Sequence, residues 1–190
     1  MTCLFFFLHK AGHLQGDLWI IKALEKVGQE TALLTVAEGG VMPLAVFLSG
    51  KARVITHRTA LQAPFELTGC AKIFFDTVGK ASSLGVALYL ALTRKKLFGA
   101  DIMYAGLATH FVPASKMSRL LMVAGKATAC PPPHTLQAVS SSLASLVEYA
   151  GPSRLQTFRG EIDRCFSVCA LSPSFLIPQF ISPQKSLLIL

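Results

Sequence analysis

The chain has 190 residues, with 18 lysines and arginines against 10 aspartates and glutamates, which gives a formal net charge of +8. Hydrophobic residues make up 52% and charged residues only 15%, which argues against a disordered polypeptide and favours a single folded domain. No apolar run approaches the roughly 20 residues that a membrane-spanning helix needs. The five cysteines are odd in number and scattered, which predicts a reducing compartment and neither a disulfide framework nor a zinc site.

The first half of the chain alternates between helical and extended patterns. Residues 18–27 place apolar side chains at helical spacing and predict a short amphipathic helix. Residues 31–37 are β-branched and apolar, which predicts a buried strand that runs directly into the turn Glu38-Gly39-Gly40. The sequence then predicts a helix with a proline in its first turn, a second strand and a short extended piece: residues 43–48, 52–56 and 61–64.

The second half opens on a run rich in alanine and leucine. Residues 84–92 predict a helix, and the cations Arg94-Lys95-Lys96 suit the negative end of its dipole. Gly99 is expected to break the chain, and Asp101 to favour the start of a short helix at 102–105. The remaining predicted elements are a strand at 107–112 and helices at 115–123 and 135–150, with a boundary at the prolines 131–133.

Residues 85–113 read GVALYLALTRKKLFGADIMYAGLATHFVP. This segment resembles the crotonase (enoyl-CoA hydratase/isomerase) superfamily, in its 3-hydroxyisobutyryl-CoA hydrolase branch, where a helix of the type LALTG-x-x-L precedes Tyr-Ala-Gly-[Leu/Ile]-Ala-Thr-His. Residues 50–56 are similar to the family's G-x-x-R-[Val/Ile]-Ala-Thr strand. Three shorter segments are similar to its Met-Pro-Glu, its Pro-Asp-Val-Gly-Gly and its acidic helix ending in Cys-Phe-Ser: residues 63–66, 76–79 and 161–167.

The alternation of strands and helices predicts an α/β fold. The resemblance implies a partial crotonase-like (ClpP/crotonase) spiral of β-β-α units with a helical C-terminal region. It covers roughly residues 29–167. The expected organisation is a divergent N-terminal segment, a crotonase-like core, a helical extension and an irregular tail: residues 1–28, 29–130, 131–167 and 168–190.

The family chemistry implies a general base, a second carboxylate and backbone N–H groups that hold a thioester oxygen. By resemblance, Glu66 matches the catalytic glutamate and Asp76 the second carboxylate. Gly39 and Gly40 are the candidate source of an oxyanion donor. The implied activity is hydrolysis of 3-hydroxyisobutyryl-CoA in valine breakdown, usually in mitochondria. No metal or redox cofactor is expected, because CoA is part of the substrate.

The chain departs from the family pattern around these residues. Phe65 separates the proline from Glu66, and the family's three consecutive glycines are reduced to Gly39-Gly40. Residues 11–17 can be read as the family's first oxyanion motif with an insertion. Glu66 is equally compatible with an ordinary loop carboxylate, and Asp76 with a cap on the following turn. His110, within an apolar strand, favours a packed histidine over a base.

The basic composition leaves the partner open. His57-Arg58 and Arg94-Lys95-Lys96 can meet the phosphates of CoA or form solvated ends of elements. Besides an acyl-CoA hydrolase, which can form a homo-oligomer, the chain is compatible with a non-catalytic interaction protein such as a mitochondrial ribosome component, because a net charge of +8 suits RNA. A third interpretation is a truncated, inactive gene product. The N-terminus shows no secretory signal and no Arg- and Ser-rich transit peptide.

Overall fold

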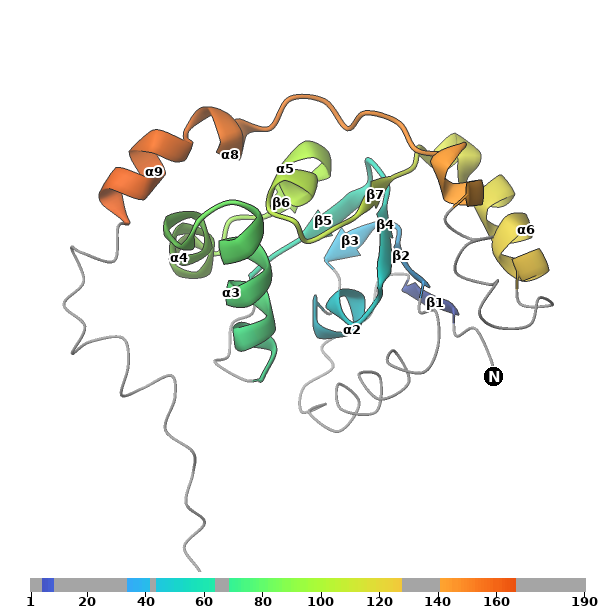
Figure 1. Cartoon of the computed structure of the whole chain (residues 1–190), viewed down its shortest axis with the longest axis horizontal. Coiled ribbons are helices and arrows are strands. Elements are labelled where there is room, and N and C mark those ends of the chain that lie inside the picture. Colours follow the sequence, from blue (N-terminus) through green and yellow to red (C-terminus); the bar gives the residue numbers. More distant parts are fainter. Residues whose placement is uncertain (1–4, 9–33, 42–43, 64–68, 128–140, 167–190) are drawn as a thin grey trace, which may run out of the picture.

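The computed structural model describes residues 5–8, 34–41, 44–63, 69–127 and 141–166, which form an α/β fold around two small sheets (Figure 1). All the strands of the larger sheet are parallel, in the order β1-β2-β4-β7. They are β1 (Phe5–Leu8), β2 (Leu34–Ala37), β4 (Ala52–Ile55) and β7 (His110–Phe111). The smaller sheet contains β3 (Gly40–Val41), β5 (Thr59–Leu61) and β6 (Leu97–Phe98).

The described chain contains repeated β-β-α units. β2 is followed by β3 and the helix α2 (Leu44–Leu48), and β4 by β5 and the helix α3 (Gly69–Ala81). Each unit adds one strand to the larger sheet and one to the smaller. The second unit lies parallel to the first, because β2 pairs with β4 and β3 with β5. This arrangement confirms the expected spiral.

Helices complete the fold. They are α4 (Leu84–Thr93), α5 (Gly99–Tyr104), the 3₁₀ turn η1 (Ala114–Lys116), α6 (Met117–Ala127), α8 (Arg154–Thr157) and α9 (Arg159–Cys165), with a further helical stretch at 141–144. In Figure 1, α3 and α4 lie on one side of the sheets and α6 on the other, while α8 and α9 pass across α5 and α4.

β2 is buried on both faces of the larger sheet, which explains its nearly unbroken apolar sequence. Leu34, Val36 and Val54 pack with α6 and the stretch at 141–146. Ala37 and Ile55 belong to the main core on the other face. That core also takes side chains from the helices, among them Phe47, Phe74, Val86, Leu155 and Ile162.

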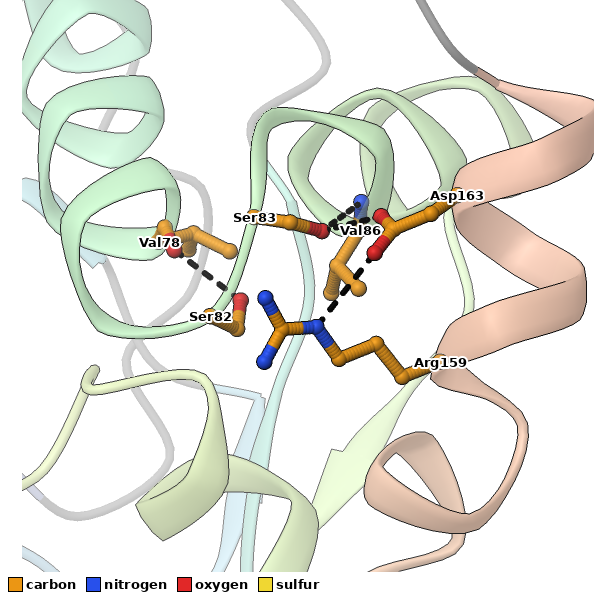
Figure 2. Close-up of polar contacts among 6 residues, drawn as sticks. All are labelled: Val78, Ser82, Ser83, Val86, Arg159 and Asp163. Carbon is orange, nitrogen blue, oxygen red and sulfur yellow. Dashed lines mark hydrogen bonds and ion pairs between the residues drawn. The ribbon is translucent and has the colours of Figure 1, made fainter.

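The C-terminal helices are joined to α4 by a polar contact at its first turn (Figure 2). The Ser83 hydroxyl accepts a hydrogen bond from the Val86 N–H at 3.1 Å and donates one to the Asp163 carboxylate. The other oxygen of Asp163 pairs with Arg159 Nε at 3.3 Å. Ser83 therefore caps α4 and fixes α9 against it at the same time.

Most predicted elements with described residues are confirmed. The strand predicted at 31–37 is β2 over its described part, and the strand predicted at 52–56 is β4. The helices predicted at 43–48, 84–92 and 115–123 correspond to α2, α4 and η1 with α6. The predicted helix at 18–27, the prolines 131–133 and the tail 168–190 lie outside the described residues.

Four predictions need correction. The extended piece at 61–64 is β5, which ends at Leu61. Gly99 begins α5 rather than breaking the chain. Of the strand predicted at 107–112, only His110–Phe111 is a strand, because the Gly106 and Leu107 carbonyls before it accept hydrogen bonds from the Arg53 side chain. The helix predicted at 135–150 is described from 141 and leaves the helical path after 146, where the Glu148 N–H bonds to the Phe111 carbonyl.

Candidate functional site

The glycine turn, residues 38–40, connects the carboxyl end of β2 to β3. Gly39 has φ +74°, in the left-handed region that glycine adopts without strain, and a Cβ there would meet no atom of the described residues within 4 Å. In open α/β folds, ligands bind outside the carboxyl ends of the parallel strands. The glycine turn lies beyond the carboxyl end of β2, where the chain leaves the larger sheet for the smaller one.

Two fully buried threonines hold this turn in place. Thr59 Oγ1 donates a hydrogen bond to the Ala37 carbonyl at 2.5 Å, directly before the turn, and accepts one from the Thr56 N–H at 3.0 Å. Gly40 pairs with Thr59 in the smaller sheet. The turn after β4 therefore fixes the turn after β2, and a positioned backbone is what an oxyanion site requires.

Glu66 lies outside the described residues, so the structure gives it no geometry. Its neighbours in the chain are fixed: Ala63 is buried in the main core, and α3 begins at Gly69. The connection that carries Glu66 thus follows β5, the strand that pairs with β3 beside the glycine turn.

Asp76 lies in the middle of α3 with its side chain exposed. Phe74 and Val78, two residues away on either side, are fully buried in the core, and two residues correspond to about 200° around a helix. Asp76 therefore projects away from the core. The interpretation of Asp76 as a cap on a following turn is wrong, because α3 continues past it to Ala81.

Arg53 is a structural residue to which the sequence patterns assigned no role. Its guanidinium donates to three carbonyls: Nε to Leu107 at 2.7 Å, Nη2 to Gly106 at 3.0 Å and Nη1 to Gly50 at 3.2 Å. Its backbone N–H donates to Thr109 Oγ1 at 2.8 Å. These five residues form the Arg53 cluster, and burial lowers the pKa of Arg53 from its ordinary value. The signal available in the sequence was its place as the arginine of the G-x-x-R segment at residues 50–56.

The Arg53 cluster explains the most family-like segment in structural terms. Gly106 has φ +68°, and a Cβ there would lie 2.3 Å from the Ala81 Cβ, so only glycine fits against α3. The Tyr-Ala-Gly-Leu-Ala-Thr-His run thus supplies carbonyls and a hydroxyl that fix β4 to the connection between α5 and β7. Its role in this structure is positional.

His110 lies at the edge strand β7, opposite Val54. Its Nδ1 is 2.7 Å from Thr109 Oγ1, and partial burial lowers its pKa. These contacts favour the packed histidine over a base at the glycine turn. His57, Arg58 and the cations of residues 94–96 are exposed. Among the described residues there is no group of three side chains able to hold a metal ion.

Comparison with known families shows to which protein family the chain belongs. The family model described as enoyl-CoA hydratase/isomerase matches residues 30–173, well over half of the chain. The chain belongs to this family. Within the described ranges, no helix is long and apolar enough to cross a membrane.

Individual relatives match only in part. The mitochondrial 3-hydroxyisobutyryl-CoA hydrolase of Xenopus laevis is 37% identical over 90 residues, which are 45% of this chain and 22% of that protein. A carnitinyl-CoA dehydratase structure from Mycobacterium thermoresistibile superposes with a TM-score of 0.61 at 23% identity, covering 77% of this chain and 42% of that one. An enoyl-CoA hydratase from Rhodobacter sphaeroides gives 0.53 at 17% identity, with the same coverage. The chain therefore spans less than half the length of these relatives.

Proposed function

We propose that the chain binds an acyl-CoA thioester and hydrolyses it, with 3-hydroxyisobutyryl-CoA as the first substrate to test. The observation that carries the proposal is the open glycine turn beyond the carboxyl end of β2, anchored by Thr59. Membership of the enoyl-CoA hydratase/isomerase family and the partial similarity to a 3-hydroxyisobutyryl-CoA hydrolase support it. The mitochondrial location of that relative likewise supports a mitochondrial setting.

In the proposed reaction, backbone N–H groups around Gly39 and Gly40 hold the thioester oxygen while water attacks the carbonyl carbon. Glu66 takes the proton of that water, and the oxyanion collapses with cleavage of the C–S bond. The thiolate of CoA leaves and is protonated, and the acid is released. This sequence of steps requires no metal and no redox cofactor.

The two carboxylates receive unequal weight in this proposal. Glu66 belongs to the connection between β5 and α3, next to the strand that pairs with the glycine turn. Asp76 is about 10 Å further along α3 than its first residue, at 1.5 Å per residue, and is exposed. We assign Glu66 the role of base and Asp76 the secondary role of orienting the water or the substrate hydroxyl.

The test is release of free CoA thiol from 3-hydroxyisobutyryl-CoA by the purified full-length chain. The Glu66→Gln variant should lose about 10²–10⁴-fold in kcat, the usual contribution of a general base. Asp76→Asn should lose less. The matched control is Glu161→Gln, because Glu161 is an exposed carboxylate on α9. Undiminished hydrolysis by Glu66→Gln contradicts the assigned base, and absence of hydrolysis by the unchanged chain contradicts the activity.

A second candidate function is a non-catalytic interaction role. The Arg53 cluster favours it, because the segment most similar to the hydrolase branch is used here for structure, which a protein without catalysis also needs. Under this alternative the net charge of +8 supports binding to RNA. An inactive chain that binds RNA with steep salt dependence fits this role, while RNA affinity that does not change with salt contradicts it.

A further inference from the structure

The segment 92–98, between the last turn of α4 and β6, combines consecutive cations with exposed apolar side chains. Arg94, Lys95 and Lys96 are all exposed. Leu92 before them is 67% exposed and Phe98 after them is 54% exposed. We call residues 92–98 the cationic segment. Its six intervals extend over at most about 22 Å, so its exposed residues lie within that distance of one another.

Backbone contacts fix the cationic segment at both ends. Arg94 ends α4 with φ +50°, and its N–H donates to the Leu90 carbonyl at 3.0 Å. Its own carbonyl accepts a hydrogen bond from Gln62 Nε2 at 2.6 Å. Leu97 is 1% exposed and pairs with Leu61 of β5. The exposure of the neighbouring side chains is therefore imposed by an ordered backbone.

An exposed tyrosine extends this surface. A Cβ on Gly99 would lie 4.0 Å from the Ala150 carbonyl oxygen, so the two backbones are neighbours. Their adjacent residues are Phe98 and Tyr149, and Tyr149 is 82% exposed. Aromatic side chains of this kind are favoured at the boundary between water and lipid, because they have an apolar body and, in tyrosine, a polar end.

The charge along the cationic segment itself is positive. The cationic segment contains no carboxylate. The next acidic residue along the chain, Asp101, already accepts hydrogen bonds from Ser153 Oγ at 2.7 Å and from the Leu155 N–H at 3.1 Å. Within the described part of the chain, neither Lys95 nor Lys96 belongs to an ion pair, and Lys95 Nζ lies 6.0 Å from the Tyr89 ring centroid.

We propose that the cationic segment, together with Tyr149, docks the protein on the surface of an anionic lipid bilayer. Lys95 and Lys96 bind headgroup phosphates, while Leu92 and Phe98 enter the interfacial region. An aliphatic side chain such as Leu92 offers no stacking platform for a nucleic-acid base, whereas a bilayer surface accommodates it together with the cations. This surface does not depend on the proposed hydrolysis.

Co-sedimentation with vesicles tests the proposal on the full-length chain. Vesicles of phosphatidylcholine with 30% phosphatidylserine, a composition near that of anionic membranes, should bind the protein about tenfold or more tightly than phosphatidylcholine alone. Raising the salt concentration should weaken this binding. Lys95→Glu with Lys96→Glu should weaken it about 30-fold or more, since each cation contributes about 1 kcal/mol and 1.4 kcal/mol is tenfold. Leu92→Ser with Phe98→Ser should weaken it about tenfold.

The matched controls lie on α6, on the other side of the molecule (Figure 1). Arg119→Glu with Lys126→Glu makes the same change in net charge, and Leu121→Ser with Met122→Ser removes comparable exposed apolar side chains. Both controls should bind vesicles as the unchanged chain does.

Thermal unfolding checks that each variant folds. If the variant Lys95→Glu with Lys96→Glu does not fold, Lys95→Gln with Lys96→Gln takes its place. Equal binding to neutral vesicles, equal loss in the α6 controls, or full binding by the lysine variants overturns the proposal. The proposal is also overturned if the lysine variants lose affinity for single-stranded RNA while their binding to vesicles is unchanged, because the surface is then a nucleic-acid site.

Discussion

The Arg53 cluster and the glycine turn lie at opposite ends of the same pair of parallel strands. Arg53 is the second residue of β4 and is in register with Thr35, whereas the glycine turn follows Ala37 at the carboxyl end of β2. The cluster joins three backbone carbonyls through one side chain, while the turn is held through Thr59, supported by Thr56, and no described atom fills the space beside Gly39.

This difference separates similarity of framework from similarity of chemistry. The segment that most resembles the family, around residues 105–112, meets the Arg53 cluster and builds the connection between α5 and β7. Departures from the family pattern fall on the glycine turn, at the opposite end of the strands, and on the sequence around Glu66, which lies outside the described residues. A high local similarity therefore supports the fold of this chain more strongly than its activity.

Removing the arginine of the cluster should have the largest effect on stability. Arg53→Met keeps much of the apolar stem but leaves three carbonyls without the guanidinium, which should cost about 3–5 kcal/mol in the free energy of unfolding. Urea unfolding followed by circular dichroism measures it. Arg58→Met is the control, since Arg58 is exposed in the next turn and should change little. If Arg53→Met lowers the free energy of unfolding no more than Arg58→Met does, then water replaces the guanidinium at these carbonyls without cost.

Thr59→Val tests the other end of the strands. The valine is similar in shape but can neither donate to the Ala37 carbonyl nor accept from the Thr56 N–H, which should cost about 1–3 kcal/mol because both groups are buried. Hydrogen exchange should then rise in the glycine turn more than in the Arg53 cluster. Thr59→Ser retains the hydroxyl and is the control. Equal exchange at both ends of the strands would show that the turn does not depend on Thr59.

Local patterns predicted the elements whose structure follows from the burial and propensity of their own residues. β2 reads as a buried strand, and the Ala- and Leu-rich run reads as α4, because these patterns follow directly from burial and propensity. The local patterns did not predict α3, whose residues 76–79 are similar to the family's Pro-Asp-Val-Gly-Gly segment. Phe75 replaces the proline, however, so nothing interrupts the helix.

Long-range partners were beyond sequence reasoning. Asp101 was expected to serve its own short helix, and the structure adds hydrogen bonds to Ser153 and Leu155, about fifty residues later in the chain. Spacing cannot reveal such a contact. Likewise, Asp76 matched a motif by residue type, but only the helix shows which way it projects. The sequence therefore predicts the glycine turn of the proposed site, whereas it identifies Glu66 and Asp76 only as candidate catalytic carboxylates.

A smaller effect of opposite sign is expected at the end of α4, where the family pattern LALTG has glycine and this chain has Arg94. Its φ of +50° is strained for any residue except glycine. Arg94→Gly should therefore stabilise the fold by about 0.5–1 kcal/mol, measured as a rise in Tm. Lys96→Gly removes the same charge at a residue without positive φ and should give no such gain. Equal gains in both variants would assign the effect to charge.

The smallest predicted effect lies at His110, beside the Arg53 cluster. Partial burial lowers the pKa of His110, so between that lowered pKa and the ordinary value near 6.5 the unfolded chain binds more protons than the folded chain. The stability that neutral His110 contributes is thus complete above about pH 6.5 and declines as the pH falls below it. His110→Gln should flatten this part of the curve, with a difference in Tm of roughly 1–2 °C between pH 7.5 and 5.5. His57→Gln, at an exposed turn, is the control. If His57→Gln flattens the curve and His110→Gln does not, then the packing around β7 tolerates the charged imidazole, and the Arg53 cluster alone secures this end of the strands.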